Sequence, residues 1–276
     1  MLAALALVVQ GCGETTSAAA ETSDVVERYD LRRDRWTRVK PIPQAVNHAA
    51  AVAYRGALYV VGGYTAAGGL AAETSALWRY EPAADRWSRL PDAPTPRAAL
   101  VAGVIGDRLY VAGGARAGRA LTTLEIYDFA SRRWARGPSM KVAREHLAGA
   151  VLGRAFYALA GRTAQRGNLR VVERYVPSRR RWERVASMDK ARGGIAAATA
   201  AGRIAVVGGE ESAGTIGEVE SFDPRTRRWR YGPRLPTPRH GLGAVSYDGR
   251  IFVLEGGPQP GLAYSRAVEA LRVAAP

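Results

Sequence analysis

The sequence predicts an all-β domain built from repeated units, and three observations carry that prediction. Five tryptophans stand in one local frame, pairs of glycines recur at the same spacing, and the residues between these markers are typical of strands and turns. Val, Tyr and Trp alternate with clusters of Gly, Pro and Asp, which favours short strands over helices. With 276 residues and 47% apolar content, the chain can also bury a large core.

Each of the five tryptophans directly follows an arginine and stands seven positions after an aromatic residue. The stretches are YDLRRDRW (29–36), YEPAADRW (80–87), YDFASRRW (127–134), YVPSRRRW (175–182) and FDPRTRRW (222–229). The tryptophans lie 51, 47, 48 and 47 residues apart. We expect each Trp to be a buried anchor of an outer strand, with the arginine before it solvated, because side chains alternate along a strand.

The glycine marker keeps the same spacing as the tryptophans. It occurs in LYVVGGY, LYVAGGA, FYALAGR, IAVVGGE and IFVLEGG, whose second glycines lie 51, 47, 48 and 48 residues apart. Within one unit the pattern predicts four short strands, in the second full unit ALVAGVI, RLYVAGG, TLEIYDF and WARGPSM. Two independent markers with one period near 48 therefore indicate a repeat architecture.

Gly-Gly followed by a spaced Tyr and Trp at close to 50 residues per unit resembles the Kelch repeat, over about residues 25–273. The resemblance implies a β-propeller with one four-stranded blade per repeat. The N-terminus supplies the later half of a unit (25–39) and the C-terminus the earlier part, so we expect five four-stranded blades closed by pairing of the N- and C-terminal strands. VVERYD and VEALRV both have the pattern of a third strand, which leaves an incomplete six-bladed ring as the alternative.

The first twelve residues resemble a secretory leader peptide. An eight-residue apolar run from Leu2 to Val9 precedes Cys12, and VVQGC resembles the lipobox of bacterial lipoproteins, in which the cysteine carries the lipid. We therefore expect a leader (1–12), a flexible polar linker (13–24) and a propeller (25–276). The protein is expected to be an exported, membrane-anchored lipoprotein of the periplasm or cell surface, with a secreted protein as the alternative.

The net charge and the cysteine content limit which partners, disulfides and metal sites are possible. The net charge is +15, but 37 of the 40 basic residues are arginines spread along every repeat, so we predict no nucleic-acid partner. Cys12 is the only cysteine, which excludes an intramolecular disulfide, a cysteine-based zinc site and the crosslinked cysteine that a Kelch-class copper-radical oxidase needs. The prediction is no metal, no cofactor and a monomer.

The resemblance also implies that ligands meet loops at one face, around the central channel. Two sets of repeat positions qualify for that face. The first set precedes each inner strand, and the second follows Gly-Gly. The candidate ligand-binding residues are Asn47, Arg97, Arg144, Arg192 and Arg239 in the first set, and Tyr64, Arg162 and Glu210 in the second. Four converging guanidiniums would attract anions, although an arginine at this position can also be structural. The loop 64–76, about four residues longer than its counterparts, is a further candidate for recognition.

The functional prediction is a binding module for a protein or an anionic glycan at the cell envelope. Catalysis has less support, because His48, His146 and His240 lack an evident Ser, Cys or carboxylate partner in sequence and no P-loop or metal motif occurs. We name no catalytic residue. The alternative is a Kelch-type sugar epimerase that uses Arg and His at the channel mouth.

Overall fold

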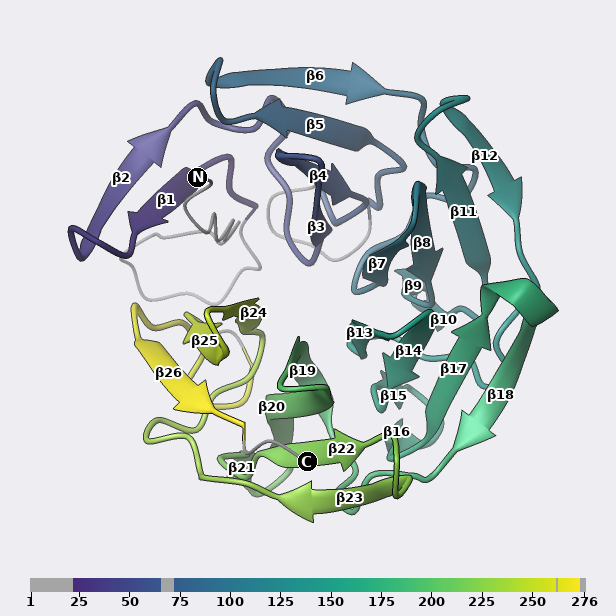
Figure 1. The fold of residues 1–276 in the computed structure, drawn as a ribbon, viewed down its shortest axis with the longest axis vertical. Coiled ribbons are helices and arrows are strands. Elements are labelled where there is room, and N and C mark those ends of the chain that lie inside the picture. The colour runs from purple at the N-terminus through teal and green to yellow at the C-terminus, as the bar shows by residue number, and fades with distance from the viewer. Residues whose placement is uncertain (1–21, 66–71, 262, 274–276) are drawn as a thin grey trace.

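The computed structural model describes residues 22–65, 72–261 and 263–273, and shows antiparallel sheets arranged in a ring around a central axis (Figure 1). Within each blade the chain runs from an inner strand beside the axis to an outer strand at the rim. Within each blade, successive strands of the sheet pair in sequence order, and the second and third strands are joined by longer connections such as residues 113–123.

The strands group into five blades and one separate hairpin. The hairpin is β1 (Val26–Asp30) and β2 (Arg35–Val39). Blade 1 is β3 (Ala50–Tyr54), β4 (Ala57–Val61), β5 (Leu77–Glu81) and β6 (Arg86–Leu90). Blade 2 is β7 (Val101–Ile105), β8 (Arg108–Ala112), β11 (Leu124–Asp128) and β12 (Arg133–Arg136). Blade 3 is β13 (Ala148–Leu152), β14 (Ala155–Leu159), β17 (Val172–Val176) and β18 (Arg181–Val185), with the 3-10 turn η1 (Pro177–Arg179).

Blade 4 and blade 5 complete the sequence of sheets. Blade 4 is β19 (Gly193–Ala200), β20 (Arg203–Glu211), β22 (Glu220–Asp223) and β23 (Arg228–Tyr231), with β21 (Gly214–Thr215) on β20. Blade 5 is β24 (Gly243–Tyr247), β25 (Arg250–Leu254) and β26 (Val268–Arg272). Two short pairs, β9 (Ala115–Arg116) with β10 (Arg119–Ala120) and β15 (Arg162–Thr163) with β16 (Gly167–Asn168), extend the loops after Gly-Gly.

The predicted all-β propeller with five blades is confirmed, but its closure differs from the prediction. Blade 5 has three strands, and among the described strands β26 pairs with β25 alone while β1 pairs with β2 alone. The expected pairing of the N- and C-terminal strands was therefore wrong. Both VVERYD and VEALRV form strands in the third position, so neither can complete the other's sheet. The β1–β2 hairpin lies in a sector of its own between blade 5 and blade 1 (Figure 1).

The core lies between neighbouring blades, and the repeated tryptophans help to join them. Each indole Nε1 donates a hydrogen bond to the backbone carbonyl that lies four residues after the preceding Trp of the repeat. The pairs are Trp87 with Lys40, Trp134 with Pro91, Trp182 with Pro138 and Trp229 with Ala186, all at 2.8 Å. These four bonds link neighbouring blades as predicted. Trp87, Trp182 and Trp229 are buried, whereas Trp36 and Trp134 are only half-buried, and the arginine before each of the five is exposed as expected.

The glycine marker has a steric cause at the blade interface. Gly62 adopts a φ of +69°, and a Cβ placed on it would lie 2.5 Å from the carbonyl oxygen of Arg97 in the next blade. The close approach allows the amide of Gly63 to donate to that same carbonyl at 3.0 Å. Glycine is therefore needed where the inner part of one blade meets the next.

Candidate functional site

The four repeated arginines lie inside the blades and not at the channel mouth. Arg97, Arg144, Arg192 and Arg239 are at most 1% exposed. Each forms an ion pair with the glutamate of the third strand of its own blade. The pairs are Arg97–Glu125 at 2.8 Å, Arg144–Glu173 at 2.9 Å, Arg192–Glu220 at 2.6 Å and Arg239–Glu269 at 3.1 Å. The predicted ring of anion-binding guanidiniums is therefore corrected: these side chains brace the blades, and a ligand cannot reach them.

The buried guanidiniums remain charged at neutral pH. Burial lowers the pKa of Arg97 and Arg144 to about 10, while the facing carboxylates of Glu125 and Glu173 act in the opposite direction. Arg144 also donates to the carbonyl oxygen of Val171 at 2.6 Å. These bonds offset part of the cost of burying the charged groups, while the buried Nε atoms of Arg97 and Arg144 have no hydrogen-bond partner among the described residues.

Asn47 was predicted to occupy the repeat position of Arg97, and the structure places it one position later in the repeat. Asn47 exchanges backbone hydrogen bonds with Tyr64, as Ala98 does with Ala115, and Ala98 comes directly after Arg97. The residue equivalent to the repeated arginine in blade 1 is therefore Val46. Asn47 belongs instead to the next position, which approaches the residues after Gly-Gly.

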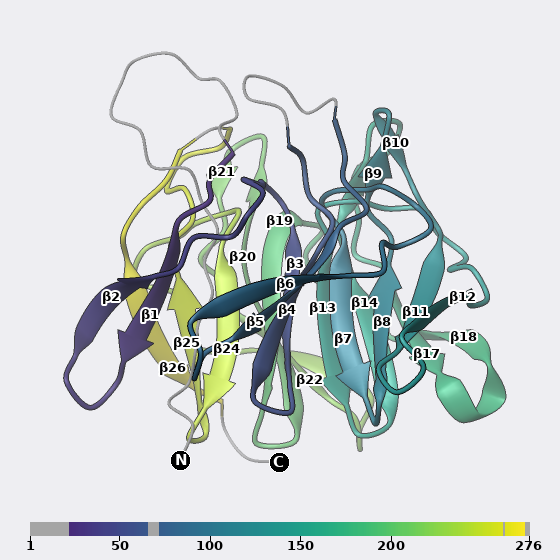
Figure 2. The ribbon, with the colours of Figure 1, turned by 90° about the horizontal axis from the view of Figure 1, so that it is seen from above.

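The mouth of the channel is framed by an arc of backbone hydrogen bonds. Five residues at equivalent positions have a positive φ: His48, Ala99, His146, Gly194 and Gly241. Each of the last four donates its amide to the carbonyl of the one before, at distances of 2.9, 3.0, 3.0 and 2.8 Å. The arc links five successive units at the face that carries the loops after Gly-Gly, which is the upper face in Figure 2 with β21 on its left and β9 and β10 on its right.

A charged cluster lies beside this arc and joins blades 3, 4 and 5. Arg162 contacts the carboxylate of Glu145 at 3.0 Å and that of Glu210 at 2.6 Å. Glu210 in turn lies 3.6 Å from His240 Nδ1 and accepts a hydrogen bond from the amide of Gly261 at 3.2 Å. The side chain of Arg162 is 33% exposed and those of Glu145 and Glu210 are 16% and 14% exposed. The predicted site residues Arg162 and Glu210 are thus brought together at the mouth.

Two imidazoles pack at the mouth. His48 and His146 have ring centroids 4.7 Å apart, and His48 lies 5.9 Å from the ring of Tyr64. Burial is the main cause that lowers the pKa of His48 to about 4, with a further contribution from nearby Arg162. Burial also lowers the pKa of His146, and His48 and Arg162 add to that effect. Both rings are therefore neutral at physiological pH.

The His48 pKa predicts a dependence of stability on pH. Between pH 6.5 and about 4 the unfolded chain binds a proton at this histidine while the folded chain does not, so acid lowers the free energy of unfolding. Glu255 acts in the opposite sense, because burial and Glu27 raise its pKa to about 7. When the pH falls from 6.5 to about 4, the free energy of unfolding should therefore decrease less in His48→Gln than in the native chain. The difference between the two decreases should be on the order of 2–3 kcal/mol. Urea unfolding across this range measures the difference, and parallel pH profiles would contradict the assignment.

The long loop after Gly63 joins the same face. Residues 66–71 lie outside the described residues, but Thr65 and Ala72 form a backbone hydrogen bond of 2.8 Å at the two ends of that segment. Glu73 accepts a hydrogen bond from the amide of Ala117, in the turn between β9 and β10, at 2.8 Å. The base of this loop is therefore held against the neighbouring loop of blade 2.

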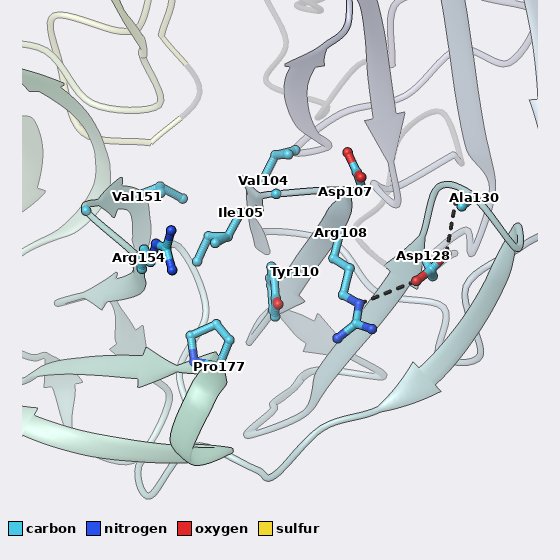
Figure 3. Close-up of a pocket in the computed structure, with 12 residues that line it drawn as sticks. Val104, Ile105, Asp107, Arg108, Tyr110, Asp128, Ala130, Val151, Arg154 and Pro177 are labelled. Carbon is cyan, nitrogen blue, oxygen red and sulfur yellow. Dashed lines mark hydrogen bonds and ion pairs between the residues drawn. The ribbon is translucent and has the colours of Figure 1, made fainter.

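A groove lies between blade 2 and blade 3, at the ends of the strands opposite the mouth (Figure 3). It has a volume of about 710 Å³, with Val104, Ile105 and Val151 on its apolar side. Arg108 is paired with Asp128 at 3.4 Å on the polar side. No residue that the sequence singled out as a site lines this groove.

Sequence reasoning missed part of the mouth cluster. Glu145 was not chosen, and His48, His146 and His240 were noted without a partner. A signal was present, because Glu145 and His240 directly follow the repeated arginine and His48 and His146 occupy the next position.

Among the residues that the structure describes, no group of three or more His, Cys, Asp or Glu is placed to hold a metal ion. Within the same residues, no helix is long and apolar enough to cross a membrane.

Comparison with known proteins agrees with this architecture. Kelch-like protein 35 of Mus musculus is 38% identical over 89 residues, which are 32% of this chain and 15% of the relative. Kelch-like protein terF of Aspergillus terreus (strain NIH 2624 / FGSC A1156) is 34% identical over 104 residues, 34% of this chain and 21% of the relative. Alpha-scruin of Limulus polyphemus is 35% identical over 107 residues, 37% of this chain and 12% of the relative. The chain thus spans about a fifth or less of the length of these relatives.

The fold comparison and the family profiles extend over more of the chain. The solved structure of YjhT superposes with a TM-score of 0.77 at 15% sequence identity, covering 91% of this chain and 89% of that chain, which shows a shared fold. The profile described as the KLHDC2/KLHL20/DRC7 Kelch-repeats domain matches residues 4–189, and the Kelch motif matches residues 191–236. Because the first profile alone covers more than half of the chain, the chain belongs to the Kelch-repeat family.

Proposed function

We propose that this Kelch propeller is a protein-binding module whose partner contacts the mouth face over Glu145, Arg162 and Glu210, with Tyr64 buried beneath them at 5% exposure. Kelch-repeat propellers are typically protein-interaction modules, and the matching curated relatives include proteins named for their Kelch repeats. The assignment to this face rests on the geometry of the mouth.

The observation that carries the proposal is the contrast between two repeat positions. The buried arginine recurs in four units because the blade needs it. The residues that form the equivalent backbone bridge to the loop before each inner strand differ in every blade. They are Tyr64, Ala115, Arg162, Glu210 and Gly257, and they converge on one rim. Variable side chains on a rigid scaffold are suited to recognition. Arg162, held between carboxylates from two blades, offers a preformed polar contact.

A capture experiment with matched variants tests the proposal. We expect proteins that crosslink to the native propeller in its own cells to be recovered equally with Arg133→Gln, whose side chain is exposed at the outer edge. Arg162→Gln should reduce recovery of the specific partner by roughly tenfold or more, because an interface arginine is a common energetic centre. Thermal unfolding confirms that both variants fold. Equal recovery with both variants would move the binding surface away from the mouth.

The anionic-glycan and epimerase predictions rest on different residues. The anionic glycan was predicted from Arg97, Arg144, Arg192 and Arg239, and their burial removes the surface for it, so we propose a protein partner. The epimerase alternative retains one supporting observation, which is the pair of neutral imidazoles beside Arg162. Turnover of sialic acid or a related sugar by the purified protein, lost in His48→Gln, would favour that alternative.

The cellular location stays a prediction. Export and lipid anchoring depend on Cys12, which lies outside the described residues. Metabolic labelling with palmitate, present in the native chain and absent in Cys12→Ser, would support the anchor.

A further inference from the structure

The groove between blade 2 and blade 3 leaves apolar side chains in an open space between two blades (Figure 3). Val104, Ile105 and Val151 line it, and each of the three is only partly buried. Its volume of about 710 Å³ is within the range of about 300–1,000 Å³ that ligand sites commonly have. The groove lies at the ends of the strands opposite the mouth, so a partner on the mouth cluster leaves it uncovered.

The equivalent gap between blade 1 and blade 2 is filled by an aromatic pair. Tyr54 is the last residue of β3 and Phe129 directly follows β11, and their rings stack with centroids 3.9 Å apart at an interplanar angle of 8°. The hydroxyl of Tyr54 donates to Asp107 of blade 2 at 2.6 Å, and Arg55 pairs with the same carboxylate at 3.1 Å. Two stacked rings and one ion pair therefore close this gap.

The groove has smaller side chains at the positions of this aromatic pair. The last residue of β7 is Ile105, in place of Tyr54, and the residue after β17 is Pro177, in place of Phe129. The residue before β14 is Arg154, so a cation stands where blade 2 has a carboxylate. An aliphatic pair thus leaves open the space that two rings fill in the neighbouring gap.

The rim of the groove carries positive charge that can bind a further carboxylate. Arg154 is exposed and has no ion pair among the described residues. Arg108 is 59% exposed, and it lies 3.4 Å from Asp128, which also accepts from two backbone amides of its own turn at 3.1 and 2.9 Å. Asp107 is engaged on the side of blade 1. In the view of Figure 3, Ile105 lies between the side chains of Arg154 and Arg108, so an apolar contact is flanked by two guanidiniums.

We propose that this groove binds an extended segment of another protein in which branched apolar side chains stand between acidic residues. The apolar side chains fill the space between Ile105 and Val151, and the flanking carboxylates pair with Arg108 and Arg154. A second copy of this chain is a poorer occupant, because its net charge of +15 opposes that of the groove rim. This surface shares no residue with the mouth cluster, so the inference does not depend on the proposed function.

Fluorescence anisotropy of the full chain with three labelled peptides of equal length tests the inference. The first peptide has a pair of leucines flanked by glutamates, the second has serines in place of the leucines, and the third has lysines in place of the glutamates. We expect the first to bind at least about tenfold more tightly than either of the others, and more weakly as salt rises. Absence of binding by the first peptide, or equal binding of the serine peptide, would overturn the proposal.

Substitutions in the groove locate the bound peptide. Arg154→Glu should weaken binding of the leucine–glutamate peptide by roughly tenfold or more, whereas Arg230→Glu makes the same charge change at an exposed residue of β23 and should leave it nearly unchanged. The double substitution Ile105→Tyr with Pro177→Phe copies the aromatic pair of the neighbouring gap and should abolish binding by filling the groove. If the double variant does not fold, the comparison of Arg154→Glu with Arg230→Glu still decides the question.

Three results would contradict the proposal. Equal affinity of Arg154→Glu and Arg230→Glu for the leucine–glutamate peptide would show attraction to the basic surface as a whole. Loss of binding in Arg162→Gln but not in Arg154→Glu would place the peptide at the mouth. Self-association of the native chain in analytical ultracentrifugation, removed by Ile105→Tyr with Pro177→Phe, would assign the groove to a second copy.

Discussion

Glu173→Ala is expected to lower the free energy of unfolding by about 3–5 kcal/mol, because it leaves a buried guanidinium without its counter-charge. Glu173 is 1% exposed and accepts from Arg144 at 2.9 Å and from the amides of Lys141 at 2.8 Å and Val142 at 3.3 Å. Removing the carboxylate therefore orphans three donors at once. Urea unfolding followed by tryptophan fluorescence measures the loss.

Glu27→Ala is the matched control for this substitution. Glu27 occupies the same repeat position in β1, but its side chain is 35% exposed and lies 3.7 Å from Arg38, so the loss should stay below about 1 kcal/mol. Glu173→Gln keeps an acceptor for the two amides and should fall between the two alanine variants. Equal losses at positions 27 and 173 would show that burial of the ion pair does not set its contribution. If Glu173→Ala does not fold, the comparison of Glu173→Gln with Glu27→Ala still tests this.

The arginines show how far the sequence could predict this molecule. Their period placed them at one repeat position, which was correct, but period alone does not give the direction of a side chain. The partner was also visible in the sequence. Each repeated arginine is followed 28 to 30 residues later by the glutamate of a third strand, whereas the first unit has Val46 and Trp78 at the two positions. The arginine and the glutamate therefore occur together in four units and are both missing from the first. Such joint occurrence predicts that the two side chains pair inside the blade, and it argues against a ring of unpaired arginines.

The mouth was only partly predictable, because its contacts join loops of different blades. Arg162 and Glu210 were selected by their place after Gly-Gly, and the structure brings them to 2.6 Å. Glu145 reaches the same cluster from the loop before β13. Its place directly after Arg144 marks it as a mouth position, but that spacing does not give its contact with Arg162. Repeat spacing therefore predicts blades and shared positions, whereas the ring closure and the mouth contacts depend on how the loops turn.

Trp182→Ala is expected to lower the free energy of unfolding by about 3–5 kcal/mol, the range for truncating a buried aromatic side chain. Trp182 is 5% exposed, and its ring packs against Tyr175 and Phe156 at centroid distances of 5.5 and 6.3 Å. Its Nε1 donates to the carbonyl oxygen of Pro138 in the preceding blade at 2.8 Å. The substitution thus removes packing within blade 3 and one link to blade 2.

Two further substitutions separate the causes of that loss. Trp182→Phe retains most of the apolar area and lacks the indole donor, so we expect about 1 kcal/mol or somewhat more, as for an unmade hydrogen bond to a buried carbonyl. Arg181→Ala, at the neighbouring residue with 61% side-chain exposure, should cost less than about 1 kcal/mol even though it removes an ion pair with Glu183 at 2.9 Å. Chemical denaturation of the three variants should show the largest loss for Trp182→Ala, a smaller one for Trp182→Phe and the smallest for Arg181→Ala. If Arg181→Ala were as damaging as Trp182→Ala, the outer strand would be held by its charged face and the interblade role of the indole would be wrong.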